Sequence, residues 1–174
     1  AQCNHVLQRC IQLLRPSAVD FVLCEIGIED NQVRNLAKHR YGCRVLQRII
    51  EHFSLERLTD LLDKIIFHAQ ELCFDEYGNY VIKHLIEHGN DEHKEKIVTV
   101  ILKDVSAVTK SKEACSVLDK ALCYTKLYKK LIEAILEHDG LLVDIACSHV
   151  GYEATQSLCR VFSRSDDVSG QGKG

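Results

Sequence analysis

A six-residue pattern recurs five times along this chain and constrains its fold more than any other feature. The pattern is a small residue, two variable residues, two apolar residues and a polar residue. Its copies are CNHVLQ at 3–8, GCRVLQ at 42–47, GNYVIK at 78–83, ACSVLD at 114–119 and GYEATQ at 151–156. Successive copies begin 39, 36, 36 and 37 residues apart. A near-constant period of this length is typical of a repeat array, in which neighbouring repeats stack and share one continuous core.

Each copy lies in a segment with helical periodicity. In the second copy, the apolar residues Val45, Leu46, Ile49 and Ile50 follow the helical period and can form one buried face. One proline and nine glycines in 174 residues leave few helix breakers. We therefore predict an all-α chain of three-helix repeats stacked into a curved solenoid. The helices that carry the pattern, the motif helices, are expected near 2–13, 42–52, 78–88, 113–123 and 150–162.

The segments between the motif helices have helical patterns of their own. Ser54 is expected to cap a helix at 55–66, where apolar residues recur with a 3.6-residue period. Further helices are expected at 17–27, 30–38, 68–74, 91–103, 104–111, 125–138 and 141–148. The repeats thus occupy residues 1–162, and the polar, glycine-rich tail at 163–174 is expected to be disordered.

Composition argues against several classes of protein. The net charge of −3 argues against a nucleic-acid binder that relies on charge alone, but not against one that uses stacking and base edges. The nine cysteines form no CxxC pair. Their odd number, without a signal-peptide pattern, indicates reduced thiols in a cytosolic or nuclear protein. No apolar run approaches the roughly 20 residues of a membrane-spanning helix.

Three positions of the pattern form the candidate binding surface. The first variable residue and the terminal polar residue are four apart, so they lie one above the other on a helix face that we expect to be exposed. Both can then meet one edge of a planar group. The residue between them is rotated by about 100° toward the next repeat, where a flat side chain could stack on that group. This geometry suits one nucleobase for each repeat.

The residue types at these positions agree with base recognition. Planar side chains occupy the middle position in the first three repeats, and stacking on an aromatic ring contributes about 1–3 kcal/mol per base. The candidate base-edge residues are Asn4, Gln8, Cys43, Gln47, Asn79, Lys83, Cys115 and Asp119. The candidate stacking residues are His5, Arg44, Tyr80 and Ser116. The corresponding residues of the fifth repeat are Tyr152, Glu153 and Gln156.

These motif helices resemble those of the Pumilio (PUF) family of RNA-binding proteins. HRYGCRVLQRIIEH at 39–52 and DEYGNYVIKHLIEHG at 75–89 carry the resemblance, which extends to about residue 162 and weakens in the fifth repeat. It implies a curved right-handed α-solenoid of about 36-residue repeats. Single-stranded RNA would bind antiparallel, with the first repeat at the 3′ end. The family's domain usually has eight repeats, so the chain is expected to be part of a longer protein or a reduced, divergent member.

The resemblance also implies which base most repeats select. Asn4 and Gln8 would read uracil, and Cys43 and Gln47 would read adenine. In the fourth repeat, the carboxylate of Asp119 can accept hydrogen bonds from guanine. The predicted element is 5′-N-G-(U/N)-A-U-3′, which overlaps the family's UGUA core.

Two repeats depart from the family pattern. In the third, Lys83 only donates hydrogen bonds, so it cannot accept the N3 hydrogen of uracil. In the fifth, Glu153 at the stacking position is anionic and has no ring, and Thr155 replaces an apolar residue. We expect the fifth repeat to bind RNA poorly or to serve as a cap.

Other chemistries have weaker support in the sequence. His84 and His88 are four residues apart, a spacing that can chelate zinc, but the sequence indicates no third ligand, and no metal or other cofactor is predicted. Cys43 with His39 nearby could be a nucleophile, yet no oxyanion-hole or elbow motif accompanies it. We therefore expect no enzyme activity.

The leading expectation is sequence-specific binding of single-stranded mRNA. The resemblance implies elements in 3′ untranslated regions and post-transcriptional control of translation or mRNA stability. We expect a cytoplasmic monomer with protein co-repressors on its convex face and no membrane association. The alternatives are a helical-repeat scaffold for protein partners and a low-specificity RNA binder in ribosome biogenesis, which would be nucleolar.

Overall fold

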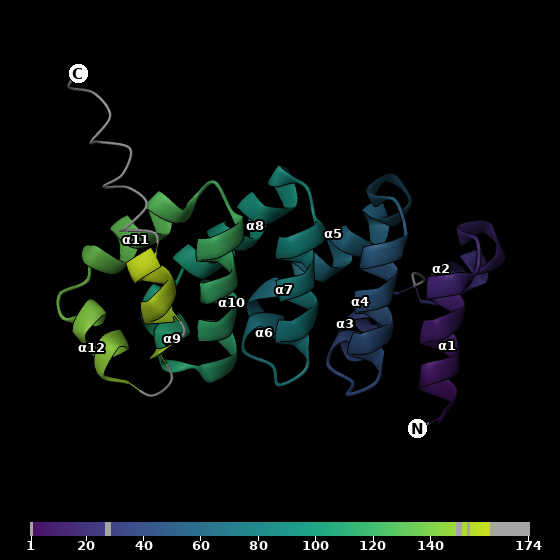
Figure 1. The fold of residues 1–174 in the computed structure, drawn as a ribbon, viewed down its shortest axis with the longest axis horizontal. Coiled ribbons are helices and arrows are strands. Elements are labelled where there is room, and N and C mark those ends of the chain that lie inside the picture. The colour runs from purple at the N-terminus through teal and green to yellow at the C-terminus, as the bar shows by residue number, and fades with distance from the viewer. Residues whose placement is uncertain (1, 27–28, 149–150, 153, 161–174) are drawn as a thin grey trace, which may run out of the picture.

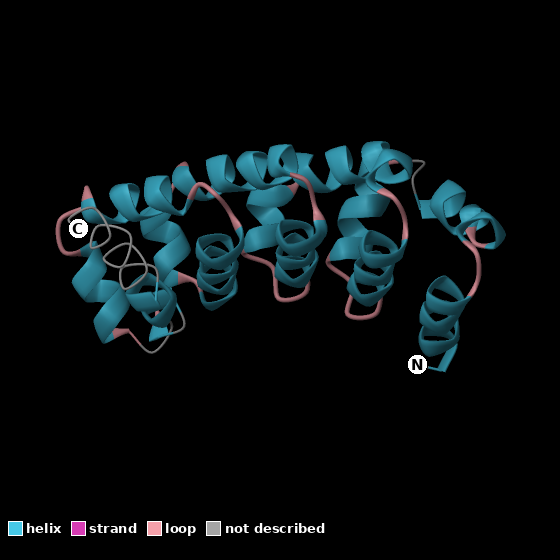
Figure 2. Cartoon of the chain, turned by 45° about the horizontal axis from the view of Figure 1, so that its top comes forward, coloured by secondary structure: helices cyan, strands magenta, loops and turns pink. Residues whose placement is uncertain are grey.

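The computed structural model describes residues 2–26, 29–148, 151–152 and 154–160. Within these ranges all regular secondary structure is helical, and two rows of helices follow one gentle curve (Figure 1, Figure 2). The all-α solenoid predicted from the repeat is therefore confirmed. Every helix in the described ranges is too short or too polar to span a lipid bilayer.

The motif helices lie side by side along the row (Figure 1). They are α1 (Gln2–Leu13), α4 (Gly42–His52), α7 (Gly78–His88) and α10 (Lys112–Tyr124). A fifth helix includes residues 152 and 154–160. Its predicted ends at 150 and 161–162, Glu153 and the predicted tail at 163–174 lie outside the described residues.

The remaining helices connect successive motif helices and give three helices to most repeats. They are η1 (Pro16–Ala18), α2 (Asp20–Ile26), α3 (Asp30–Ala37), η2 (Leu55–Leu58), α5 (Thr59–Phe67), α6 (Ala69–Cys73), α8 (Asp91–Leu102), α9 (Val105–Lys110), α11 (Tyr128–Leu136) and α12 (Leu141–Cys147). Here η1 and η2 are 3₁₀ helices.

Three of the predicted helices differ from the structure at their starts. The helix expected at 17–27 is a 3₁₀ turn, η1, followed by α2 from Asp20. The helix expected at 55–66 begins as a 3₁₀ turn, and the Ser54 side chain makes no capping hydrogen bond. The helix expected at 125–138 begins only at Tyr128. Thr125 ends the preceding helix with an extended backbone, and its hydroxyl donates to the Ala121 carbonyl at 2.8 Å. This bond back to the previous turn makes Thr125 a helix end, which apolar periodicity alone does not reveal.

Side chains from successive motif helices build one continuous core. Leu46 and Ile49 on α4, and Ile82 and Leu85 on α7, are fully buried. Burying such a side chain contributes about 1.5–3 kcal/mol relative to leaving it exposed. Because equivalent residues recur in each repeat, the apolar stripe of one motif helix forms one slice of a shared interior.

The small residue that opens the pattern is required by close packing of the backbone. A Cβ atom added at Gly42 would lie 2.3 Å from the carbonyl oxygen of Leu36, at the end of α3. A Cβ atom added at Gly78 would lie 2.9 Å from the carbonyl oxygen of Leu72 in α6. The motif helices α4 and α7 therefore start directly against the short helix before them, and this contact sets the position of the predicted base-edge and stacking residues that follow.

Ion pairs join neighbouring repeats along the array. Arg34 Nε and Lys38 Nζ of the second repeat lie 2.5 and 2.6 Å from the Glu71 carboxylate of the third. Hydrogen bonds from Arg34 and Lys38 lower the pKa of Glu71 from 4.5 to about 2, and the bond from Arg34 has the larger effect. Farther along, Lys126 Nζ lies 2.6 Å from Asp91.

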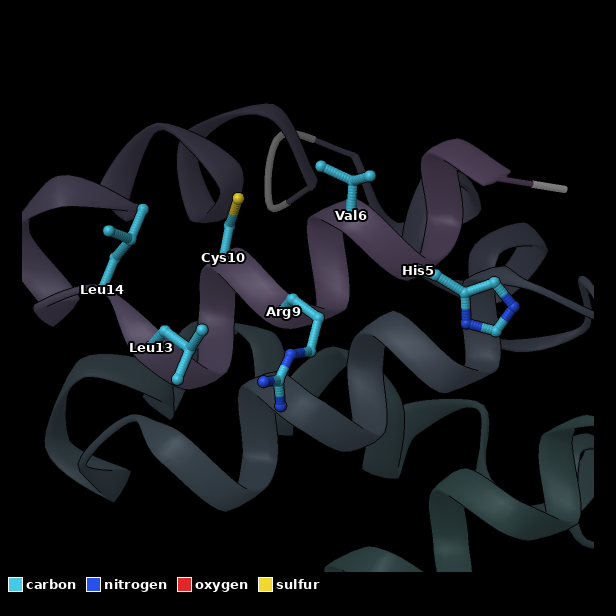
Figure 3. A pocket seen from close by; sticks show the side chains of 6 residues that line it. All are labelled: His5, Val6, Arg9, Cys10, Leu13 and Leu14. Carbon is cyan, nitrogen blue, oxygen red and sulfur yellow. The ribbon is translucent and has the colours of Figure 1, made fainter.

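Helix α1 ends the row and presents an apolar surface. Its exposed side chains include Val6 and Leu13, which are 64% and 68% exposed. They belong to a pocket of about 360 Å³ (Figure 3). The lining residues are His5, Val6, Arg9, Cys10, Leu13 and Leu14. An apolar face of this kind is the face that a motif helix packs against its neighbour in a repeat array.

Candidate nucleic-acid interface

A groove of about 470 Å³ runs across the first three motif helices. It brings together predicted residues from three repeats: Asn4, His5 and Gln8 from α1, Arg44 from α4 and Tyr80 from α7. Four further residues, from the turns before α4 and α7, complete its lining: Arg40, Tyr41, Glu76 and Tyr77.

Two predicted stacking residues face each other across neighbouring repeats. The guanidinium carbon of Arg44 lies 5.0 Å from the centroid of the Tyr80 ring. The ammonium of Lys83 lies 4.5 Å from the same centroid. Arg44 is exposed, and Tyr80 is 39% exposed. A planar cation and an aromatic ring are therefore available at the surface, each able to stack on a base.

The predicted base-edge residues of the second and third repeats lie deeper than expected. Cys43 and Gln47 are each 1% exposed, and Asn79 is 4% exposed, so the prediction of an exposed face is wrong for them. The reason is that neighbouring motif helices pack closely. These positions lie in the interface between two adjacent motif helices, which we call a seam. The Arg44 side chain also covers Gln47, because its Nη1 donates to Gln47 Oε1 at 3.2 Å.

The buried edge residues differ in whether their polar atoms have partners. Asn79 Nδ2 donates to the carbonyl oxygens of Asp75 and Glu76 at 2.8 and 2.9 Å. By contrast, Gln47 Nε2 and Asn4 Oδ1 are buried with no hydrogen-bond partner among the described residues. Leaving such a group unpaired costs about 1–3 kcal/mol. A donor and an acceptor without partners therefore stand at two of the positions predicted to read bases.

Cys43 is unsuited to nucleophilic chemistry. Burial raises the pKa of its thiol, which favours the neutral form. Its Sγ donates to the Arg40 carbonyl at 3.5 Å. His39 does not activate it, because His39 Nδ1 accepts the backbone N–H of Gly42 at 3.2 Å. His39 is thus bonded to the first residue of α4.

Two predicted residues of the fourth repeat bond to side chains of the neighbouring repeats. Lys83 Nζ donates to Ser116 Oγ at 2.9 Å, and Ser116 Oγ donates to the Glu113 carbonyl at 2.9 Å. Asp119 Oδ1 accepts the hydroxyl of Ser157, from the fifth motif helix. Cys115, the other edge residue of the fourth repeat, is 2% exposed.

In the fifth repeat the described candidate residues are exposed and bond locally. Tyr152 is 63% exposed, and Gln156 Nε2 donates to its hydroxyl at 2.8 Å. Both lie one helical turn apart on the same helix. Gln156 therefore differs from Gln47, which is buried between two motif helices beneath the side chain of a stacking residue.

Sequence reasoning missed the turn residues of the groove, although a signal was present. Tyr41 and Tyr77 precede the glycine of the pattern in two successive repeats, 36 residues apart. The guanidinium of Arg40 lies 4.9 Å from the Tyr41 ring centroid. In the equivalent turn, Asp75 Oδ1 accepts the N–H groups of Tyr77 and Gly78 at 3.0 and 2.9 Å. These capped turns hold aromatic rings at the rim of the groove.

Comparison with known proteins agrees with this geometry. The profile of the Pumilio-family RNA binding repeat matches residues 4–26, 32–66 and 68–102, together more than half of the chain. Pumilio homology domain family member 4 of Saccharomyces cerevisiae is 31% identical over 141 residues. That alignment covers 79% of this chain and 16% of the yeast protein.

Solved RNA complexes have the same fold. The structure of PUF-8 with PBE-RNA matches with a TM-score of 0.81 and 28% identity, over 88% of this chain and 47% of that one. The Puf4 RNA binding domain, bound to the HO endonuclease RNA 3′ UTR recognition sequence, matches with a TM-score of 0.81 and 26% identity, over 95% and 52%. This chain thus spans about half of each solved domain. Given its repeated motif helices, its groove and these matches, the chain belongs to the Pumilio family of RNA-binding repeat proteins.

Proposed function

We propose that this chain binds single-stranded RNA sequence-specifically, with one base at each of its first four motif helices. The observation that supports this most directly is Gln47. Its amide nitrogen is buried without a partner beneath a guanidinium that rests on the tyrosine ring of the next repeat. A base entering here would supply the missing acceptor and a flat surface for stacking.

Binding at this position requires one side chain to move. Arg44 occupies the space above Gln47 and against the Tyr80 ring, so a base must displace its guanidinium. Arg44 is exposed and can rotate into solvent without losing core packing. The base would then lie between Arg44 and Tyr80 with its edge toward Gln47. Adenine offers an amino donor beside ring-nitrogen acceptors, which match the oxygen and nitrogen of a glutamine amide.

The other repeats are proposed to recognise bases in the same way. Asn4 and Gln8 are the proposed uracil readers at the 3′ end, and Asp119 is the proposed guanine reader. Asn79 keeps its amide oxygen as an acceptor, because its nitrogen is bonded to the backbone. The proposed element remains 5′-N-G-(U/N)-A-U-3′, in the 3′ untranslated region of mRNA. The proposed outcome is control of translation or mRNA stability by binding, with no catalysis, in the cytoplasm, and with protein partners on the convex face.

Fluorescence anisotropy with labelled RNAs tests the proposal. One RNA carries UGUAU, a second replaces the guanine, a third replaces the adenine, and a fourth replaces both. We expect each single replacement to weaken binding about tenfold, which corresponds to about 1.4 kcal/mol. Equal affinity for the first and fourth RNAs would contradict the proposal that the chain reads bases.

A low-specificity RNA binder is the second candidate, and one observation favours it. Lys83, Ser116 and Asp119 all bond to other protein groups, so half of the array has few polar atoms left for base edges. Such a binder would hold mainly phosphates, and its affinity would fall steeply with salt concentration. Measuring the UGUAU and random RNAs from low to high salt separates the two candidates. A constant preference for UGUAU supports base reading, and equal affinities at every salt concentration support the second candidate.

A further inference from the structure

Three metal-ligating side chains meet near the carboxyl ends of α4 and α7. Glu51 comes from α4, and His84 and His88 come from successive turns of α7. One ligand atom from each lies within 4.8 Å of the other two. The closest approach is 2.5 Å, between Glu51 Oε1 and His84 Nε2, and the two imidazole centroids are 5.5 Å apart. The third ligand that the sequence did not indicate is thus Glu51, 33 residues before His84.

We propose that Glu51, His84 and His88 bind a divalent transition metal ion of the zinc type, which would link the second and third repeats. Two imidazole nitrogens and one carboxylate oxygen are a ligand set that suits Zn²⁺, and also Co²⁺ and Ni²⁺. Three protein ligands leave a fourth position for water or an external ligand, as in sites that are open to solvent. This proposal does not depend on RNA binding.

The geometry needs only side-chain adjustment. Zinc–ligand bonds of about 2.0–2.2 Å in a tetrahedron place ligand atoms roughly 3.3 Å apart. The Glu51–His84 pair must therefore open, and His88 must turn toward both. His88 is exposed and can turn, whereas the side chains of Glu51 and His84, 17% and 22% exposed, need only separate slightly. The i, i+4 spacing of the histidines already places both rings on one helix face.

Neighbouring charged side chains orient the Glu51 ligand and also lower the expected affinity for a metal ion. Arg48 contacts the other oxygen of Glu51, Oε2, which leaves Oε1 directed at His84. Such a contact orients the ligand, as outer partners do at known metal sites. The guanidinium charge also opposes a second cation. His52 Nε2 lies 3.9 Å from Glu51 Oε2, so it is a neighbour and not part of the three-atom cluster.

The test uses the complete, metal-stripped, reduced chain, with Zn²⁺ in calorimetry and Co²⁺ in visible absorption. We expect a single equivalent of Co²⁺ to give d–d bands without the intense charge-transfer band of thiolate ligands. His88→Ala removes an exposed ligand and should weaken binding about tenfold or more, and Glu51→Gln should do the same. His138→Ala, at an exposed histidine outside the cluster, is the matched control and should leave binding unchanged.

Thermal unfolding supplies a second measurement. Because the metal would bind the folded state and join two repeats, Zn²⁺ should raise the Tm of the wild-type chain and of His138→Ala. The rise should be lost in His88→Ala, whose circular dichroism should match that of the wild type. The proposal is overturned if the wild-type chain binds no metal, if His88→Ala binds as tightly as the wild type, or if Co²⁺ shows thiolate ligation.

Discussion

Two seams between motif helices use the same positions of the pattern in different ways. In the seam between α4 and α7, Gln47 Nε2 has no partner, and the Arg44 guanidinium packs on the Tyr80 ring. In the seam between α10 and the helix at 154–160, the Asp119 carboxylate accepts a hydrogen bond from Ser157. A buried polar atom that lacks a partner within the protein gains more from a ligand's hydrogen bond than an atom that is already bonded. The first seam is therefore the better candidate for base recognition.

The largest effect on this comparison is expected from Tyr80→Ala. Removing the ring takes away a stacking surface in the first seam, so affinity for the UGUAU RNA should fall by about 1–3 kcal/mol, or roughly 5- to 150-fold. Anisotropy titration measures this change. The matched control is Tyr152→Ala, which removes an exposed ring from the fifth repeat and should change affinity less than about twofold. Equal losses in both variants would contradict the difference between the two regions.

Gln47→Glu should change selectivity more than affinity. The carboxylate keeps acceptors but loses the amide donor, so it can no longer pair with both a donor and an acceptor on adenine. We expect the preference for adenine over guanine at that position to fall about tenfold. A competition assay with RNAs that differ only at this base measures the ratio. Gln156→Glu, at the corresponding exposed position of the fifth repeat, should leave every base preference as it is in the wild type.

Ser157→Ala should bring the second seam closer to the first. Without the serine hydroxyl, the Asp119 carboxylate loses a competing donor, and both of its oxygens can then accept hydrogen bonds from guanine. The preference for guanine at that position should rise by up to about fivefold, which corresponds to about 1 kcal/mol for one hydrogen bond. Competition between RNAs that differ at the guanine measures it. An unchanged preference would show that the hydrogen bond does not limit base reading by the fourth repeat.

The smallest effect concerns the ion pairs that link repeats. Arg34 and Lys38 lower the pKa of Glu71 to about 2 in the folded chain, so this carboxylate stabilises the fold above its usual pKa of 4.5. That contribution is lost as the pH falls from about 4.5 toward 2. Because the Glu71 side chain is 37% exposed, we expect Glu71→Gln to cost only about 0.2–1 kcal/mol at neutral pH.

Urea unfolding near neutral pH and near pH 3 measures this contribution of Glu71. The difference between the wild type and Glu71→Gln should shrink at the lower pH. Asp91→Asn removes a more exposed ion pair, with Lys126, and should have the smaller effect. A larger effect of Asp91→Asn would mean that the link between the fourth and fifth repeats is the stronger one.

The helical architecture was predictable because its causes are local or periodic. The apolar period places α4 and α7 from their own residues, and the small first residue of each pattern copy marks where a motif helix meets the helix before it. The starts of α5 and α11 were not predictable in this way. They depend on a 3₁₀ turn at 55–58 and on the Thr125 hydroxyl bond, which leave the apolar pattern unchanged.

By itself, the sequence determined the period of the array, the class of the fold and the family, because these follow from spacing and residue type. The tertiary structure decided how the polar atoms are used, because their partners lie one repeat away. It buried Gln47, bonded Ser157 to Asp119 across 38 residues, and brought Glu51 to His84 across 33. In a stacked array the chemistry of a side chain depends on the neighbouring repeat, and only the packed structure identifies that neighbour.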